Sequence, residues 1–241
     1  MMQKDMVAAA GVLGLGIVIA ALIGSLTFYN VRSMDNTLSV TGSATQALKA
    51  DSAKWSVSVS RSAYESEVPS AQSRVARDAQ AVLTFFSKGG IPEGRISTTP
   101  VSVDQDYSYS NDSNAPRRYT IREQITVSSD DPSQIESLSK DIGELAAQGI
   151  LVSAGQPEYY VSSLPSVRVA LIGKAVEDAK ARAESIAKST GQSVGALKSA
   201  SSGVVQVMQP NSVDISDYGS YDTSTIDKQV MVTARATFFI R

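Results

Sequence analysis

The side chains best suited to chemistry in this sequence are carboxylates gathered in two polar segments. Asp104, Asp106 and Asp112 lie close together in the chain, and a second acidic segment runs from Asp214 to Asp227. Several oxygen ligands in one loop could hold a hard cation such as Ca²⁺. Neither segment has the spacing of an EF-hand loop, with its central glycine and its terminal glutamate. We therefore interpret both as solvated loop carboxylates and predict no metal site and no cofactor.

Glutamates offer a second chemistry, general acid–base catalysis. Glu65 and Glu67 lie near each other, and Glu123 shares the strand alternation of Ile121 and Ile125. An inward-facing carboxylate needs a partner and often marks a functional site. A strand-edge position, or a salt bridge with a neighbouring arginine, is the more ordinary interpretation, and it is the one we adopt.

The sequence contains no histidine and no cysteine. Without them the chain cannot build a Ser-His-Asp triad, a Cys-His pair or a His-ligated zinc or haem site. An enzyme would have to rely on carboxylates, lysine, tyrosine or Ser–Lys chemistry, and no constellation of that kind stands out. We therefore predict that this protein is not an enzyme.

Tyrosines are concentrated around two polar loops, residues 110–118 and 209–228. Tyrosine is common in contact surfaces because it combines a large apolar ring with a polar tip. We predict contacts with a second subunit or an envelope partner, ordinary loop tyrosines being the alternative. The candidates are Tyr107, Tyr109, Tyr218 and Tyr221.

Hydrophobic periodicity predicts the elements that position these side chains. The expected strands are 38–42, 53–60, 96–109, 119–128, 151–161, 196–208 and 230–240, and the expected helices begin near 68, 132 and 165. Asp131 and Gln134 are placed to form a capping box at the second helix. The order β-β-α-β-β-α-β-α-β-β predicts an α+β fold, with about three helices packed on a mostly antiparallel sheet.

The run from Met6 to Val31 contains no charged residue. Because it is long enough to cross a bilayer, we expect a retained transmembrane helix that contacts lipid. A cleaved signal peptide and a buried core helix are the alternatives. The expected division is a cytoplasmic stub (1–5), an anchor (6–31), a linker (32–37) and one α+β domain (38–241).

One face of the predicted anchor carries small residues, Gly16, Ala20 and Gly24. Small residues at this spacing let membrane helices approach closely, so we predict a packing face for neighbouring subunits. The alternative is that glycine and alanine are simply common in membrane helices.

The net charge of −2 at pH 7 and the absence of a basic stripe argue against nucleic-acid binding. A hydrophobic content of 42% is typical of a globular chain with a real core.

Several segments, in order, resemble those of one known family. Residues 38–44 have a V-x-G-x-A cadence, 90–98 resemble the exit from the first helix, and 175–187 carry most of an A-x-x-D-A-x-x-K-A-x-x-x-A pattern. Tyr107 and Tyr109 precede the predicted hairpin loop, and Arg118-Tyr119 follow it. Together they resemble the SIMPL-domain family of bacterial envelope proteins over nearly all of 38–241.

The resemblance implies an exported, envelope-associated protein with no established catalytic residues, from a family tied to stress tolerance and, in some members, to ring-like oligomers. We therefore expect an inner-membrane, single-pass protein whose C-terminal domain lies in the periplasm or outside the cell. That domain is expected to assemble into a ring or cage that supports envelope integrity or stress tolerance. The alternative is a binding module that captures a protein or small ligand through its Asp/Tyr-rich loops.

Overall fold

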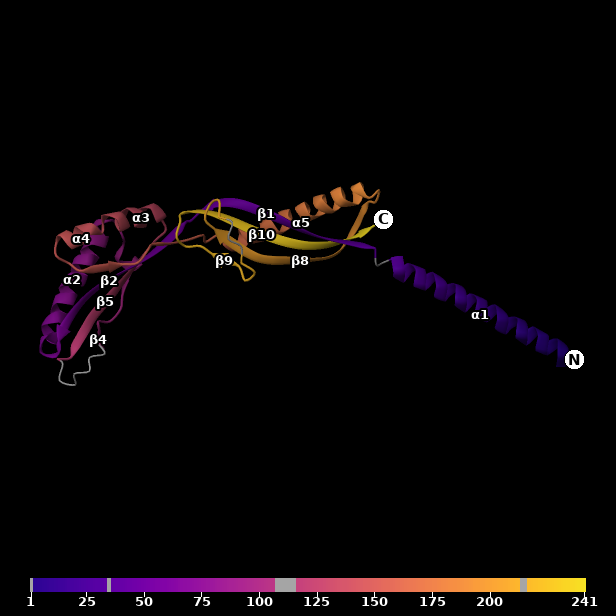
Figure 1. The fold of residues 1–241 in the computed structure, drawn as a ribbon, viewed down its shortest axis with the longest axis horizontal. Coiled ribbons are helices and arrows are strands. Elements are labelled where there is room, and N and C mark those ends of the chain that lie inside the picture. The colour runs from indigo at the N-terminus through magenta and orange to yellow at the C-terminus, as the bar shows by residue number, and fades with distance from the viewer. Residues whose placement is uncertain (1, 34–35, 107–115, 213–215) are drawn as a thin grey trace. The chain divides into compact units, whose positions relative to one another are not determined.

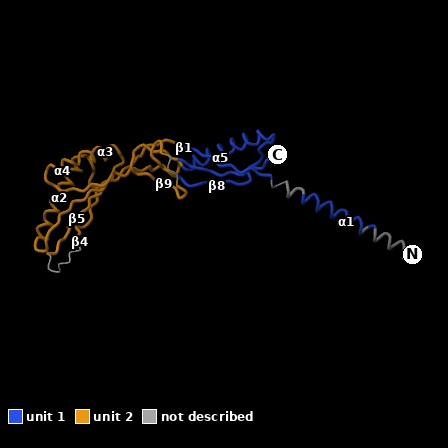
Figure 2. Tube along the Cα trace, viewed as in Figure 1, with its two compact units in different colours: residues 1–45, 168–205, 231–241 blue, residues 46–167, 206–230 orange. Residues whose placement is uncertain are grey.

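The computed structural model describes residues 2–33, 36–106, 116–212 and 216–241, and in the first helix it describes side chains at 11 and 13–28. The chain divides into two compact units (Figure 2). Unit 1 comprises residues 1–45, 168–205 and 231–241, and unit 2 comprises residues 46–167 and 206–230.

Unit 1 contains helix α1 (Met2–Ser33) and most of a sheet with helix α5 (Leu164–Ser189) packed along it (Figure 1). The four-stranded sheet has the order β1-β10-β8-β9. Its strands are β1 (Thr37–Lys49), β10 (Asp227–Ile240), β8 (Val194–Met208) and β9 (Ser220–Tyr221). Ala179 and Ala183 of α5 pack on Ala236 and Phe238 of β10, so small side chains let the helix lie close to the sheet.

Helix α5 and strand β1 approach each other closely at Gly42. A Cβ atom there would overlap the main chain of Ala175 and Ala179. The next main-chain N–H, that of Ser43, donates a hydrogen bond of 2.8 Å to Oδ2 of Asp178, which also accepts one from Nε of Arg182. The V-x-G-x-A strand and the A-x-x-D-A helix of the sequence therefore meet in one contact.

Unit 2 is built on a six-stranded sheet with the order β3-β5-β2-β6, in which β4 also pairs with β5 and β7 with β2. The long central pair runs antiparallel, from Ala53 opposite Ser129 to Tyr64 opposite Arg118. Its strands are β2 (Ser52–Tyr64), β5 (Arg118–Ser129), β3 (Ile96–Thr98), β4 (Ser102–Asp106), β6 (Val152–Ala154) and β7 (Glu158–Tyr160).

The core of unit 2 lies between this sheet and three helices, α2 (Val68–Lys88), α3 (Pro132–Asp141) and α4 (Gly143–Ala147). Trp55 on β2 packs edge-on against Phe86 on α2, with 5.6 Å between the ring centroids. Nε1 of Trp55 donates to the carbonyl of Gly155 at 2.7 Å, so the one polar atom of this buried ring has a partner. The remaining regular elements are two 3-10 turns, Glu65–Glu67 and Glu93–Arg95.

The predicted α+β class and the order of the long elements are confirmed, but the prediction of one sheet is wrong because the strands form two. The predicted strand 96–109 is interrupted after Thr98, and 151–161 is interrupted after Ala154. Pro100 and Pro157 lie in these breaks, and proline has no N–H to donate to a strand ladder. Polar loop 209–228 contains the short strand β9, which runs parallel to β8.

The predicted cap of α3 is half right. The carboxylate of Asp131 accepts the N–H of Ser133 at 3.0 Å, as expected of an N-cap. Gln134 does not complete a capping box, because its amide accepts from Oγ of Ser129 at 2.7 Å and donates to the carbonyl of Gly89 at 2.9 Å. It therefore ties the end of α2 to the start of α3.

Within the part of the chain that the structure describes, no helix combines the length and apolar character that crossing a membrane requires. The predicted span over residues 6–31 gains no support from this and stays a prediction.

Candidate functional site

The predicted packing face of α1 has no partner within the described chain. Gly16, Ala20 and Gly24 are all exposed. Cβ atoms built at Gly16 and Gly24 would meet nothing within 4 Å. The face is open, and its role in subunit packing stays a prediction.

The predicted contact tyrosines differ from one another in their surroundings. Tyr218 is 96% exposed. Tyr221 is held in place, because its hydroxyl accepts the N–H of Val161 at 2.8 Å and its ring lies 5.9 Å from that of Tyr160. Tyr107 and Tyr109 lie outside the described residues. Of the two tyrosines that can be compared, Tyr218 is the more available to another molecule, although Tyr221 is still 39% exposed.

A buried ion pair joins Lys228 to Asp222 in loop 209–228. The Lys228 side chain is 0% exposed. Its Nζ lies 3.2 Å from Oδ1 of Asp222 and donates a hydrogen bond of 2.5 Å to the main-chain carbonyl of Asp222. The Asp222 carboxylate also accepts from Nε2 of Gln209 at 3.1 Å and from the N–H of Ser224 at 3.0 Å. The network therefore holds the loop against β10.

Both partners have pKa values moved by this environment. Burial lowers the pKa of Lys228, and its hydrogen bond to Asp222 opposes that change only in part. Burial raises the pKa of Asp222, but hydrogen bonds from Gln209, Lys228 and Ser224 outweigh it, so that pKa lies below its ordinary value. A lysine with a lowered pKa can act as a base, but this amine is bonded and closed to solvent, so we assign it a structural role.

Sequence reasoning missed this network, although one signal pointed to it. Lys228 occupies the same alternation on β10 as the buried Val230 and Val232. A lysine in the inward phase of a strand needs an internal partner.

Those carboxylates singled out in the sequence that the structure describes do not gather into one site. Asp104 accepts from the Ser102 hydroxyl and Asp106 from the Thr120 hydroxyl, while Asp112 lies outside the described residues. Glu123 lies opposite Val59 and is half-buried, and burial raises the pKa of its carboxyl. Across the described ranges, no group of three or more His, Cys, Asp or Glu side chains is arranged to hold a metal ion.

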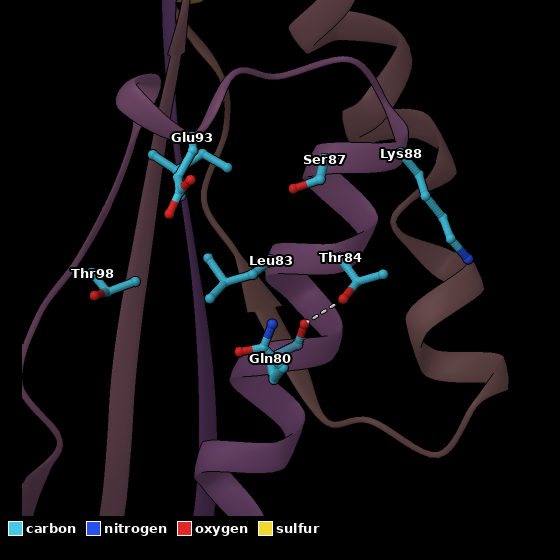
Figure 3. A pocket seen from close by; sticks show the side chains of 8 residues that line it. Gln80, Leu83, Thr84, Ser87, Lys88, Glu93 and Thr98 are labelled. Atoms are coloured by element: carbon cyan, nitrogen blue, oxygen red, sulfur yellow. Dashed lines mark hydrogen bonds between the residues drawn. The ribbon is translucent and has the colours of Figure 1, made fainter.

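A cavity of about 650 Å³ lies between α2 and β3 (Figure 3). Leu83 and Ile96 contribute apolar surface, and the Thr84 hydroxyl donates to the Gln80 carbonyl at 2.9 Å. Lys88 extends away from Leu83 and Thr98 in this view. The lining offers hydroxyl and amide groups, one carboxylate, Glu93, and one amine, Lys88; no ion pair joins these two described side chains, so the lining indicates no reaction.

A different feature stands out on β8. From Val194 to Val205 one side of this strand adjoins β10, and in the described chain no strand pairs with the other side, because β9 pairs only at Gln206 and Val207. Figure 1 shows β8 along the border of its sheet. Side chains 196–202 are all exposed, so neither face of the strand is covered there. We call residues 194–205 the open edge of β8.

Comparison with known proteins places these features in a family. The sequence model of SIMPL, a protein of unknown function (DUF541), matches residues 38–238. This chain belongs to the SIMPL family. The match begins in β1 and ends in β10, so the Gly42 contact, the Asp222–Lys228 pair and the open edge of β8 all lie within the SIMPL region.

Other comparisons add little to the SIMPL assignment. No curated protein matches the chain. Among solved structures, the de novo designed protein Foldit4 aligns over 43% of this chain and 93% of its own, with 14% identity and a TM-score of 0.20. That likeness is too slight to inform the fold.

Proposed function

We propose that this SIMPL protein is a non-catalytic structural protein of the bacterial envelope that assembles with further copies of itself. The observation that carries the proposal is the open edge of β8, from Val194 to Val205. An unpaired strand edge presents a row of N–H and C=O groups, and a second strand is the partner that satisfies them best.

The chemistry of the described side chains supports a structural role. Among the side chains that the structure describes, the one strongly buried charge, Lys228, is bonded to Asp222 and closed to solvent. Glu123 is half-buried, but the residue opposite it on β2 is the apolar Val59 rather than a second ionisable residue. In the cavity between α2 and β3, Glu93 and Lys88 are not joined by an ion pair.

The proposal includes a tether to the cytoplasmic membrane through residues 6–31, with the SIMPL domain on the outer side. Two observations support it: the run has no charge, and the large apolar side chains described in α1 are well exposed, among them Leu13 at 69% and Phe28 at 67%. Lipid would cover such side chains. Copies tethered in one membrane meet at high effective concentration, which favours a ring or cage that supports envelope integrity or stress tolerance.

Light scattering on the detergent-solubilised full-length protein tests the assembly. We expect a protein mass that is a multiple of the 25.4 kDa chain. A control variant with Gly16, Ala20 and Gly24 all changed to Leu blocks the small-residue face of α1 and leaves the domain intact. If the domain itself assembles, this variant stays oligomeric, whereas a monomeric wild-type protein contradicts the proposal.

A binding module is the second candidate, and the exposure of Tyr218 favours it. In that case the polar loops contact a different envelope protein or a small ligand. A monomeric mass in the same light-scattering experiment would favour this candidate over self-assembly.

A further inference from the structure

The strand edges of this protein are protected to different degrees. On β1, the Ser43 N–H is already bonded to Asp178, and α5 lies against the strand at Gly42. A second strand could pair along this part of β1 only by displacing the Asp178 carboxylate. In the other sheet the outer strands are short: β3, β6 and β7 have three residues each and β4 has five. Short and covered edges are devices by which proteins avoid pairing with other chains.

β8 has few of these devices. It is 15 residues long and contains no proline. Its one charged side chain within the open edge is Lys198, whose Nζ lies 5.6 Å from the centre of the Phe239 ring on β10. The ammonium group therefore lies toward the neighbouring strand of its own sheet, while the adjoining side chains are small and exposed.

We propose that the open edge of β8 pairs antiparallel with the same edge of a second copy, which joins two sheets across a two-fold axis. This inference rests on the proposed self-assembly and names the surface that joins copies two by two; because a two-fold contact closes at a dimer, a ring or cage requires a second contact besides it. Two identical antiparallel edges complement each other by symmetry. With a single charge, the edge has little to attract a partner of opposite charge, and the Asp178 bond on β1 disfavours head-to-tail pairing of β8 with β1.

Lys198 restricts the register of the pair. An axis through residue 198 would make the two Lys198 residues a directly opposed cross-strand pair, and like charges paired in this way are unfavourable. An axis near Ala200 instead places Lys198 across from Ser202 of the second copy. In that register Leu197, which is 47% exposed, lies across from Gly203 of the second copy, and Val204, which is 37% exposed, lies across from Ala196.

The absence of native cysteine makes single-cysteine cross-linking a clean test. Residues 196–202 are changed to cysteine one at a time in the full-length, detergent-solubilised protein, and cross-linking under mild oxidation is measured. Directly opposed antiparallel residues have Cα atoms about 4.5–5.5 Å apart, within the range that a disulfide spans. We expect one sharp maximum near position 200, and efficient cross-linking between mixed Lys198→Cys and Ser202→Cys chains. Leu151→Cys, at an exposed position of unit 2, is the control and should cross-link weakly.

A charge variant gives a second readout. Ala200→Lys places two like charges near the axis and should weaken association by about tenfold or more, whereas Ala200→Ser should leave it close to wild type. Circular dichroism checks that both variants fold.

The possible results separate the two proposals. An oligomer with equal, weak cross-linking at all seven positions, or one that Ala200→Lys does not weaken, would overturn the edge pairing and leave self-assembly standing. A monomer in light scattering would overturn self-assembly itself.

Discussion

At the residue scale, the buried ammonium group of Lys228 depends on one carboxylate. Asp222 supplies a charged and a main-chain acceptor to a side chain that is 0% exposed. Removing one partner of a buried ion pair leaves an uncompensated charge, while replacing the lysine with an apolar side chain of similar volume removes the charge altogether.

Asp222→Asn should therefore destabilise the protein by about 3–5 kcal/mol at neutral pH, and Lys228→Met by much less. Denaturant unfolding of both variants beside wild type measures this. If Lys228→Met were the more damaging change, the pair would be a net source of stability and this account of it would be wrong.

The penalty of Asp222→Asn should also depend on pH. The folded-state pKa of Lys228 is below its ordinary 10.5, so the unfolded chain binds more protons in that window and stability rises with pH as the lysine becomes neutral. The folded-state pKa of Asp222 is below its ordinary 3.8, so its contribution is present above that value and is lost as pH falls through the folded pKa. The stability difference between wild type and Asp222→Asn is therefore largest near neutral pH, where both groups are charged. It shrinks at high pH, where Lys228 is neutral, and at low pH, where Asp222 is protonated. A stability difference that stays constant with pH would contradict this.

At the element scale, the contact of α5 with β1 explains why the two family-like segments have the residues they have. Gly42 leaves room for the helix main chain, and Asp178 accepts the N–H of Ser43. The Ala175 and Ala179 side chains are fully buried and small enough to permit this approach.

Gly42→Ala should therefore destabilise the fold by about 1–3 kcal/mol or more, because the new methyl group overlaps helix main chain that cannot rotate away. Gly94→Ala is the matched control, since a Cβ there meets nothing within 4 Å, and it should change stability little. Thermal unfolding of the two variants measures this difference. Equal unfolding midpoints would contradict the prediction, because they would mean that β1 and α5 move apart at little cost.

Sequence periodicity was enough to predict the α+β class, the long elements and their order, because each depends on local alternation and on turn residues. Strand pairing could not be predicted in the same way, because no local pattern in the sequence indicates that β10 pairs with β1 and β8 while β5 pairs with β2. The division into two sheets was therefore not predicted. Gly42 and the 175–187 helix were recognised as motifs, but their contact joins residues far apart in the chain. The buried position of Lys228 was not predicted, although its place in the alternation of β10 indicated an inward-facing side chain.

At the scale of the whole molecule, the proposed tether and the proposed edge pairing would act together. A strand pair contributes mainly main-chain hydrogen bonds, each of modest net strength, so pairing in dilute solution would be weak. Holding copies in one membrane raises their effective concentration and favours the same contact.

Amide hydrogen exchange on the full-length protein tests the central claim most directly, because it reads the main-chain groups that pairing engages. Exchange is compared between concentrated and diluted detergent-solubilised samples, with the Asp222–Lys228 loop and the core strand β5 as internal references. The account predicts that amides of residues 194–205 on the unpaired side exchange more slowly in the concentrated sample, while β5 is unchanged. Equal exchange of residues 194–205 at both concentrations, in samples that light scattering shows to differ in assembly, would contradict it.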